Sequence, residues 1–346
     1  MKIAIDISPL QTGHKVRGVG FYLKNLKKTL LRYDTRNDYI FFAQDEKLDN
    51  KADLVHYPYF EPFFITLPFF SKQKRVVTVH DLTPIVFPEH FPAGIKGKFS
   101  WQVQKFNLQR SDGIITDSES SKKDIIRYVG APESKIHVVY LAAGDEFKKL
   151  EAGNWRLEIL KRYKLPEQFV LYVGDVTWNK NLPRLIHAIK QLNIPLVMVG
   201  KALSEQDFDR TNPWNRDLVE VQRLVEGDSR FIKLGFVPTE DLVSLYNTAT
   251  VLAMPSLYEG FGLPVVEAMQ CGCPVVTTRE GSLSEVAGGA AEYVDAHDVQ
   301  SIVNGIKKIY FNKELQDELS KRSIIQAKKF SWEKTAKETV AVYRKV

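Results

Sequence analysis

Cysteine and long apolar runs are scarce in this chain of 346 residues. The only two cysteines, Cys271 and Cys273, are separated by one residue, so they cannot form a disulfide framework, and no Cys or His spacing typical of a zinc site is present. The longest unbroken apolar run, residues 63–70, contains a proline and is far shorter than the roughly 20 residues that cross a membrane. The brief apolar run at the N-terminus carries Asp6, so we interpret it as a first strand and not as a signal peptide. These features predict a cytoplasmic protein in a reducing compartment.

An excess of positive charge is confined to the first half of the chain. Residues 1–165 contain 27 Lys and Arg against 19 Asp and Glu, whereas residues 166–346 contain 21 against 23. A basic half indicates an anionic partner such as a membrane surface, a nucleic acid or a phosphorylated substrate, and a solvated basic face is the alternative. We exclude a nucleic acid as a partner, because the chain lacks the aromatic and basic strand signature of a nucleic-acid-binding sheet.

Strand-like and helix-like segments alternate along the chain, and the alternation restarts after a polar, lysine-rich stretch at residues 144–164. Alternating strands and helices are typical of parallel sheets covered on both faces. We therefore predict an α/β protein of two doubly wound, parallel-sheet (Rossmann-like) domains that face each other across a cleft. The predicted boundaries are residues 1–164 for an acceptor-side domain, 165–328 for a donor domain, and 329–346 for a C-terminal helix that returns to the first domain.

The most informative segment reads PSLYEGFGLPVVEAMQCGCPVV and follows a predicted strand, where ligands bind in doubly wound folds. Gly262 allows the backbone to approach a ligand closely, and Pro264 suits the first turn of a helix. The free N–H groups at such a helix start form an anion site that suits a diphosphate. Glu259 and Glu267 lie on either side of this site, where their carboxylates can accept hydrogen bonds from sugar hydroxyls.

Glu259 and Glu267 form an E-x7-E pattern that resembles the retaining glycosyltransferases of family 4, also called group 1, which have the GT-B fold. The resemblance implies that Glu259 contacts the donor sugar and that Glu267 binds the ribose hydroxyls of the nucleotide. It also implies that the backbone around Phe261, Gly262 and Leu263 holds the sugar and the diphosphate.

Further segments in family order extend this resemblance over nearly the whole chain. Gly18 and Gly20 are expected in an N-terminal glycine loop that wraps over the diphosphate or the acceptor. They do not form a dinucleotide fingerprint, because Leu23 occupies the place of the third glycine. Val237 lies in a segment similar to the base-binding segment of the family. The segments that carry the resemblance are DISPL, RGVGFYLKNL, VHDLTPIVFPEHFP, LYVGDVTWNKN, LGFVPTEDLVSLYNTA, SLSEVAGGAAEYVD and FSWEKTAKETVAVY.

Two positions after predicted strands supply candidate charged groups. Lys180 is a compact cation suited to the leaving diphosphate, but the residue before it is Asn179, where the family commonly has Arg. In the other domain, the family resemblance implies that His80 reaches the donor sugar near the reacting carbon. Asp81, on the acceptor side, either orients His80 or caps the next segment.

No metal site and no cofactor are expected, and the nucleotide sugar is a substrate. Asp207 and Asp209 form a D-x-D pattern, but it lies in a polar loop and not at a strand end. We expect Lys180 and the helix-start amides to neutralise the diphosphate, so that transfer proceeds with retention and without a metal.

The similarity to a bacterial polysaccharide mannosyltransferase-like branch favours GDP-mannose as donor and a lipid-linked or polysaccharide acceptor. A UDP-sugar donor and a non-catalytic nucleotide-sugar-binding protein are the alternatives. Residues 59–75 and 95–106 combine aromatic and basic side chains, which suit an anionic membrane surface on the inner face of the cell membrane. The alternative is that these aromatics pack in the core.

Overall fold

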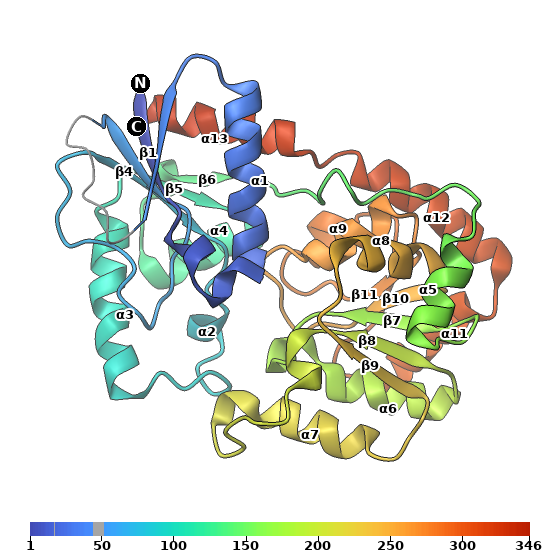
Figure 1. Cartoon of the computed structure of the whole chain (residues 1–346). Coiled ribbons are helices and arrows are strands. Elements are labelled where there is room, and N and C mark those ends of the chain that lie inside the picture. Colours follow the sequence, from blue (N-terminus) through green and yellow to red (C-terminus); the bar gives the residue numbers. More distant parts are fainter. Residues whose placement is uncertain (17, 44–51) are drawn as a thin grey trace. The chain divides into compact units, whose positions relative to one another are not determined.

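We describe a computed structural model of the chain that covers residues 1–16, 18–43 and 52–346 (Figure 1). Its contacts divide the chain into two compact units. The first unit consists of Met1–Ala142 together with Phe330–Val346, and the second consists of Ala143–Lys329.

The first unit is built on a sheet of six parallel strands in the order β2-β1-β3-β4-β5-β6. Its central strands are buried along nearly their whole length because helices cover both faces, which explains why they read as continuous apolar runs. The strands are β1 (Lys2–Asp6), β2 (Asp38–Phe42), β3 (Leu54–Tyr57), β4 (Lys74–Val79), β5 (Gly113–Thr116) and β6 (Ile136–Val138).

Local capping residues set the helix ends of the first unit. Ser118 accepts a hydrogen bond from the backbone N–H of Ser121 and so caps the helix after β5. Gly130 ends that helical stretch in a left-handed conformation, with φ of 75°. The helices are α1 (Gly18–Tyr33), α2 (Thr83–Val86), α3 (Gly94–Gln109), α4 (Glu119–Asp124) continuing as a π-helical turn (Ile125–Val129), and α13 (Trp332–Lys345).

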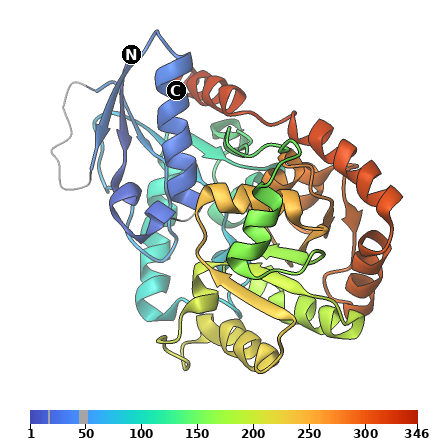
Figure 2. The same cartoon turned by 45° about the vertical axis from the view of Figure 1, so that its right-hand side comes forward.

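The C-terminal helix α13 packs beside α1, at the opposite end of the sequence, as both views show (Figures 1 and 2). Thr335 donates a hydrogen bond to the carbonyl of Tyr140 at 2.7 Å. Tyr343 is fully buried, and its hydroxyl lies 2.7 Å from Nδ1 of His56 on β3. These contacts explain why Phe330–Val346 groups with the first unit.

The second unit is built on another sheet of six parallel strands, in the order β12-β11-β10-β7-β8-β9. Its chain passes from β9 at one edge to β10 beside β7, so the loops after β7 and β10 lie next to each other at the carboxyl ends of the strands. The strands are β7 (Val170–Val173), β8 (Leu196–Val199), β9 (Phe231–Gly235), β10 (Val251–Met254), β11 (Val275–Thr277) and β12 (Glu292–Tyr293).

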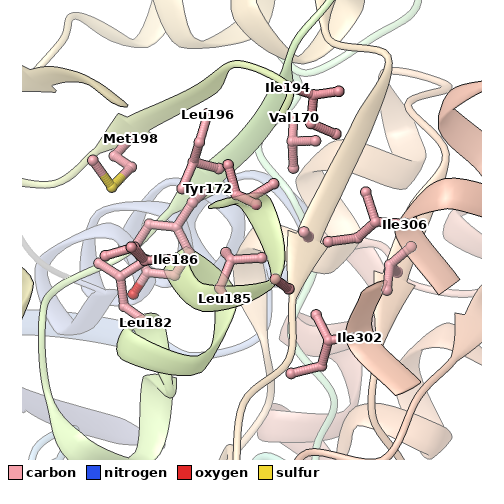
Figure 3. Packing of buried hydrophobic residues seen from close by; sticks show 14 of the residues in the cluster. Val170, Tyr172, Leu182, Leu185, Ile186, Ile194, Leu196, Met198, Ile302 and Ile306 are labelled. Atoms are coloured by element: carbon pink, nitrogen blue, oxygen red, sulfur yellow. The ribbon is translucent and has the colours of Figure 1, made fainter. Parts of the chain in front are cut away.

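Apolar side chains from strands and helices form the core of the second unit (Figure 3). Leu182, Leu185 and Ile186 of α6 pack against β7 and β8, and Ile302 and Ile306 of α11 belong to the same cluster. The helices are α5 (Trp155–Tyr163), α6 (Leu182–Leu192), α7 (Arg216–Val225), α8 (Thr239–Thr248), α9 (Leu263–Gln270), α10 (Leu283–Ala287), α11 (Val299–Tyr310) and α12 (Lys313–Ala327).

The structure places the division between the units earlier than the sequence predicted, at residues 142/143 and not at 164/165. The physical reason is a set of polar contacts that fasten residues 143–164 to α8. Asn247 accepts a hydrogen bond from the backbone of Leu150, and Asp241 bonds both Arg162 and Tyr163 of α5. The α/β class and the two parallel sheets are confirmed.

Within the described ranges, no helix is long and apolar enough to cross a membrane.

Candidate functional site

Two predicted charged residues of the second unit form an ion pair at the ends of neighbouring strands. Lys180 ends the short 3₁₀ helix η5 (Trp178–Lys180) after β7, and Glu259 lies in the loop after β10. The Lys180 Nζ lies 2.8 Å from both carboxylate oxygens of Glu259. The two side chains are 19% and 8% exposed, so the pair is largely shielded from water. The structure thus brings the proposed diphosphate cation and the proposed sugar contact together.

Asn179, which replaces the arginine common in the family, cross-links the two loops. Its side-chain amide donates to the carbonyl of Tyr258 at 3.0 Å, and its own carbonyl accepts from the backbone N–H of Leu257 at 2.7 Å. Thr177 donates to the Asn179 Oδ1 at 2.8 Å. Two of these hydrogen bonds hold the loop after β7 against the segment of Glu259, and the bond from Thr177 fixes the Asn179 side chain within its own loop.

The loop of Glu259 turns into helix α9 through a left-handed glycine. Gly262 has φ of 92°, and a Cβ at this position would lie 2.9 Å from a side-chain atom of Leu283. Only glycine adopts this conformation without strain, so the turn requires Gly262. Phe261 is buried, and Leu263 begins α9, where the anion site expected from the sequence stays a prediction.

A second glycine, Gly281, was missed in the sequence analysis and packs closely against the backbone of Glu259. Gly281 has φ of 58°, and a Cβ there would lie 2.5 Å from the carbonyl oxygen of Glu259. The next residue, Ser282, donates both its backbone N–H and its hydroxyl to that same carbonyl oxygen, each at 3.1 Å. The available signal was a glycine three residues after the predicted strand PVVTT, but nothing local indicates that it meets Glu259.

Glu267, the predicted ribose contact, is buried in α9 and paired with a tyrosine of α8. The hydroxyl of Tyr246 donates to the Glu267 Oε2 at 2.9 Å. Burial raises the pKa of Glu267 to about 7, and the hydrogen bond from Tyr246 offsets this only in part. The sequence analysis placed Tyr246 in the base-binding segment but did not predict this contact.

Val237 lies directly after β9 and is only 5% exposed, whereas the preceding Phe236 is 64% exposed. The assignment of Val237 to the base-binding segment stays a prediction.

In the first unit, His80 follows β4 and has a different carboxylate partner from the one predicted. The sequence suggested that Asp81 either orients His80 or caps the next segment. In the structure, the Asp81 carboxylate accepts the backbone N–H of Thr83 at 2.8 Å, at the start of α2. The imidazole Nδ1 instead lies 2.6 Å from the Oδ2 of Asp117, which follows β5. Asp117 is a residue that the sequence analysis missed, although its place after a strand was visible.

The predicted loop position of Gly18 and Gly20 is wrong, because both residues lie in the first turn of α1. A Cβ on Gly20 would lie 2.5 Å from the carbonyl oxygens of His14 and Lys15 in the preceding 3₁₀ helix η2 (Gly13–Val16). This glycine therefore allows the helix start to pack closely on the turn before it. Arg17, the first residue of the quoted RGVG motif, lies outside the described residues.

The predicted rejection of a metal at the D-x-D pattern stays a prediction. Asp209 accepts the backbone N–H and the hydroxyl of Thr211 in a local turn, and Asp207 is exposed. Residues 1–16, 18–43 and 52–346 contain no cluster of three or more His, Cys, Asp or Glu side chains that could hold a metal ion.

Comparison with known families gives two matches along the chain. Residues 156–326 match the family described as "Glycosyl transferases group 1", and residues 9–143 match "Glycosyltransferase Family 4". The first match spans the Lys180–Glu259 pair and Glu267, and the second spans His80 and Asp117.

Two curated relatives from Escherichia coli are mannosyltransferases by name. The O-antigen chain mannosyltransferase B is 33% identical over 279 residues, which cover 79% of this chain and 70% of that protein. The serotype-specific mannosyltransferase WbdA is 31% identical over 274 residues, which cover 76% of this chain but only 32% of WbdA. The chain thus spans about a third of the length of WbdA.

A solved structure with the same fold is that of Anabaena HepE in complex with UDP-glucose. It superposes with a TM-score of 0.76 at 17% sequence identity, and the match covers 100% of both chains. At this identity the likeness establishes the fold, which is GT-B. Given the two family matches, the extensive identity to mannosyltransferase B and this fold, the chain belongs to the group 1 (family 4) glycosyltransferases.

Proposed function

We propose that this glycosyltransferase moves mannose from GDP-mannose to a hydroxyl of a lipid-linked or polysaccharide acceptor, with retention of the α configuration and without a metal ion. The names of the E. coli relatives support mannose and a polysaccharide acceptor. The observation that carries the proposal is the shielded contact between Lys180 and both carboxylate oxygens of Glu259, beside the start of α9.

The charge arrangement of this site suits departure of a nucleoside diphosphate. The diphosphate gains negative charge as the bond to the sugar breaks, and a fixed cation stabilises that charge most strongly where water is excluded. In this proposal Lys180 supplies a positive charge and the start of α9 supplies the positive end of a helix. A metal ion is therefore not required by this proposal.

Retention follows in this proposal from attack on the face that the diphosphate leaves. The acceptor hydroxyl forms the new bond to the anomeric carbon while the bond to the leaving phosphate oxygen breaks, and that oxygen takes the hydroxyl proton. Glu259 is a sugar-positioning group in this scheme, and Lys180 contacts both of its carboxylate oxygens. By family resemblance, His80 also contacts the transferred sugar.

A UDP-sugar donor is the second candidate, because HepE of the same fold was solved with UDP-glucose. Base recognition through backbone atoms would give no side-chain signature for guanine or uracil. The non-catalytic alternative rested only on Asn179, which stands where the family commonly has Arg. In the structure this residue has a role, because its hydrogen bonds join the loop of Lys180 to the loop of Glu259. We therefore favour the catalytic function.

A thermal-shift panel distinguishes these donors. The proposal predicts that GDP and GDP-mannose raise the melting temperature more than UDP, UDP-glucose and ADP at equal concentration, because a ligand stabilises only the state that binds it. Repeating the panel with EDTA should leave the GDP-mannose shift unchanged. A larger shift with UDP-glucose would assign the second candidate instead.

We also propose that the first unit binds an anionic membrane surface, where a lipid-linked acceptor would be found. The structure divides the aromatic segment at residues 59–75: Phe60 and Leu67 are core residues, whereas Phe64, Phe69 and Phe70 are 53% to 89% exposed. Buried Gln104 of α3 fixes this segment through hydrogen bonds to Leu67 and Glu61. We call the exposed surface of α3 and residues 64–70 the aromatic–basic patch. It comprises Phe64, Ile65, Phe69, Phe70, Ile95, Lys96, Lys98 and Phe99.

Arg75 is not part of this patch, although the sequence grouped it with Lys72 and Lys74. Its side chain is 5% exposed and donates to the carbonyl of Asn107, while Lys72 and Lys74 are exposed. Exposed apolar residues beside lysines favour insertion at an anionic interface.

A further inference from the structure

The contact between His80 and Asp117 is not explained by the family resemblance, which concerned His80 and Asp81. His80 follows β4 and Asp117 follows β5, and these parallel strands are neighbours in the first sheet. Their carboxyl ends therefore bring the two side chains together, with Nδ1 2.6 Å from Oδ2. The imidazole is 18% exposed and the carboxylate 3%, so the hydrogen bond is formed in a nearly dry environment.

Packing holds the imidazole in a single orientation. The ring of Tyr22, on α1, meets the His80 ring edge-on, with centroids 4.8 Å apart. The Tyr22 hydroxyl lies 3.1 Å from the Thr78 Oγ1, which is also 2.8 Å from the Nε2 of His56. These polar groups satisfy one another, so they do not compete with Asp117 for the His80 Nδ1.

Four charged or titratable groups surround the His80 ring: Asp117 after β5, Asp81 after β4, His56 on β3 and Tyr22 on α1. Asp81 is engaged at the N-terminus of α2, so Asp117 is the carboxylate bonded to the ring. Burial alone would lower the pKa of His80, but the charge and hydrogen bond of Asp117, helped by Asp81 and the Pro58 carbonyl, raise it above 6.5.

His56 behaves in the opposite way because no carboxylate contacts it. Complete burial, together with the nearby charge of His80, lowers the pKa of His56 to about 3. The first unit therefore contains two buried histidines whose pKa values are shifted in opposite directions, down for His56 within the sheet and up for His80 at its edge.

We propose that Asp117 is a positioning residue that fixes the His80 ring and keeps it as an imidazolium at neutral pH. An imidazolium donates hydrogen bonds but has no lone pair to accept a proton, so His80 acts on the sugar as a fixed positive group and not as a general base. This role in sugar transfer rests on the proposed function. It agrees with a retaining mechanism, in which the leaving phosphate oxygen takes the acceptor proton.

The direct test is an NMR titration of the histidine side chains in the intact protein. The chain has seven histidines, and the His80→Gln variant assigns the His80 signal by its disappearance. In the wild-type protein we expect the His80 ring to remain doubly protonated at pH 7. A neutral His80 ring at pH 7 would overturn the proposal without any variant of Asp117 being needed.

The Asp117→Asn variant keeps the size of the side chain and removes its charge. We expect the His80 titration midpoint to fall by roughly 1–3 pH units, because the opposite charge is lost and burial remains. Asp81→Asn is the matched control, since it removes the other nearby carboxylate but leaves the ring hydrogen bond, and its shift should be clearly smaller. Equal shifts in the two variants, or none in Asp117→Asn, would contradict the proposal.

A rate measurement separates positioning from a purely structural role. With the accepted nucleotide sugar, kcat of Asp117→Asn should fall more steeply than that of the wild type as the pH rises from about 6 to 8, because the variant loses its imidazolium over that range. If kcat of Asp117→Asn were reduced by the same factor at every pH, the positioning role of Asp117 would be contradicted. If the wild type transferred no sugar, the proposed function would fail, whereas the NMR result would still decide the state of the His80–Asp117 pair.

Discussion

At the scale of single residues, the Lys180–Glu259 contact makes the most direct prediction. Lys180→Ala removes a charge-assisted bond worth roughly 1.5–3 kcal/mol, so nucleoside-diphosphate affinity should fall about 10- to 150-fold by titration calorimetry. Lys201→Ala is the control, because Lys201 is 63% exposed and forms a surface ion pair with Glu205 at 3.8 Å. Unchanged affinity in a folded Lys180→Ala protein would remove this lysine from the site.

The two glutamates are expected to affect different steps. Glu267→Ala should mainly weaken nucleotide binding, because its proposed partner is the ribose. Glu259→Ala should mainly lower turnover, because its proposed partner is the reacting sugar. Measuring free GDP affinity and kcat for both variants tests this division, and an equal loss of GDP affinity would contradict it.

Glu267 also predicts how donor binding depends on pH. Burial raises its pKa from 4.5 to about 7, so below that pH the carboxyl is largely protonated and accepts ribose hydrogen bonds less well. Affinity for GDP should therefore increase as the pH rises from 6 to 8, and Glu267→Gln should abolish most of this increase. Calorimetry at three pH values checks the prediction, and a flat wild-type profile would argue against it.

The raised pKa of Glu267 also affects the free energy of unfolding. This effect has a pH dependence opposite to that expected for GDP affinity. A carboxyl whose pKa is raised on folding favours the folded state fully below its unfolded value and loses that contribution as the pH rises through about 7. The donor site thus becomes better suited to its ligand over the pH range in which Glu267 becomes costly to bury.

At the scale of secondary-structure elements, the Gly281–Ser282 turn at the start of α10 supports the loop after β10. Gly281→Ala would force a side chain into a left-handed conformation and place its Cβ 2.5 Å from the Glu259 carbonyl oxygen. Displacement of Glu259 by about 1 Å can cost roughly 100-fold in rate, so we expect a loss of that order in kcat.

The matched control for this turn is Gly289→Ala. A Cβ on Gly289 would meet nothing within 4 Å, and its φ is not positive. Both variants should keep the circular dichroism spectrum of the wild type, and only Gly281→Ala should lose turnover. Comparable activity in the two variants would show that the turn does not position Glu259.

The aromatic–basic patch on α3 and residues 64–70 predicts reversible binding to anionic vesicles. Each lysine near such a surface contributes about 1 kcal/mol, and the attraction fades within a Debye length as salt is added. Replacing Lys96 and Lys98 with Gln should therefore reduce co-sedimentation, whereas replacing the exposed Lys328 and Lys329 should not. A protein that ignores anionic vesicles at low salt would show that the patch does not bind membranes.

Element positions were predictable because their signals are local. The parallel strands are short apolar runs, and the E-x7-E spacing fixes two carboxylates around a helix start. The loop assigned to Gly18 and Gly20 failed because glycine also permits close packing at a helix start.

The partners of the site residues were not predictable from local patterns. Asp117 lies 37 residues from His80, Tyr246 lies 21 residues from Glu267, and Ser282 lies 23 residues from Glu259. The contact of His80 with Asp117 depends on which strands become neighbours in a sheet, and that of Tyr246 with Glu267 depends on how α8 packs against α9. A single sequence specifies neither arrangement. The unit boundary was misplaced for the same reason, since contacts to α8 hold residues 143–164.

At the scale of the whole molecule, the account combines a second unit that contains the Lys180–Glu259 ion pair with a first unit that contains the His80–Asp117 pair. The second unit carries the carboxylates, the cation and the helix start proposed for the nucleotide sugar. The first unit carries the His80–Asp117 pair and the patch proposed for the acceptor surface.

The measurement that tests the central claim most directly is NMR analysis of the first glycoside formed from GDP-mannose. The protein is incubated in EDTA with GDP-mannose and a panel of alkyl mannoside acceptors, and the anomeric coupling of the product is recorded before any equilibration. The account predicts release of GDP and an α-linked mannoside. A β-linked product, or consumption of UDP-glucose while GDP-mannose remains intact, would contradict it.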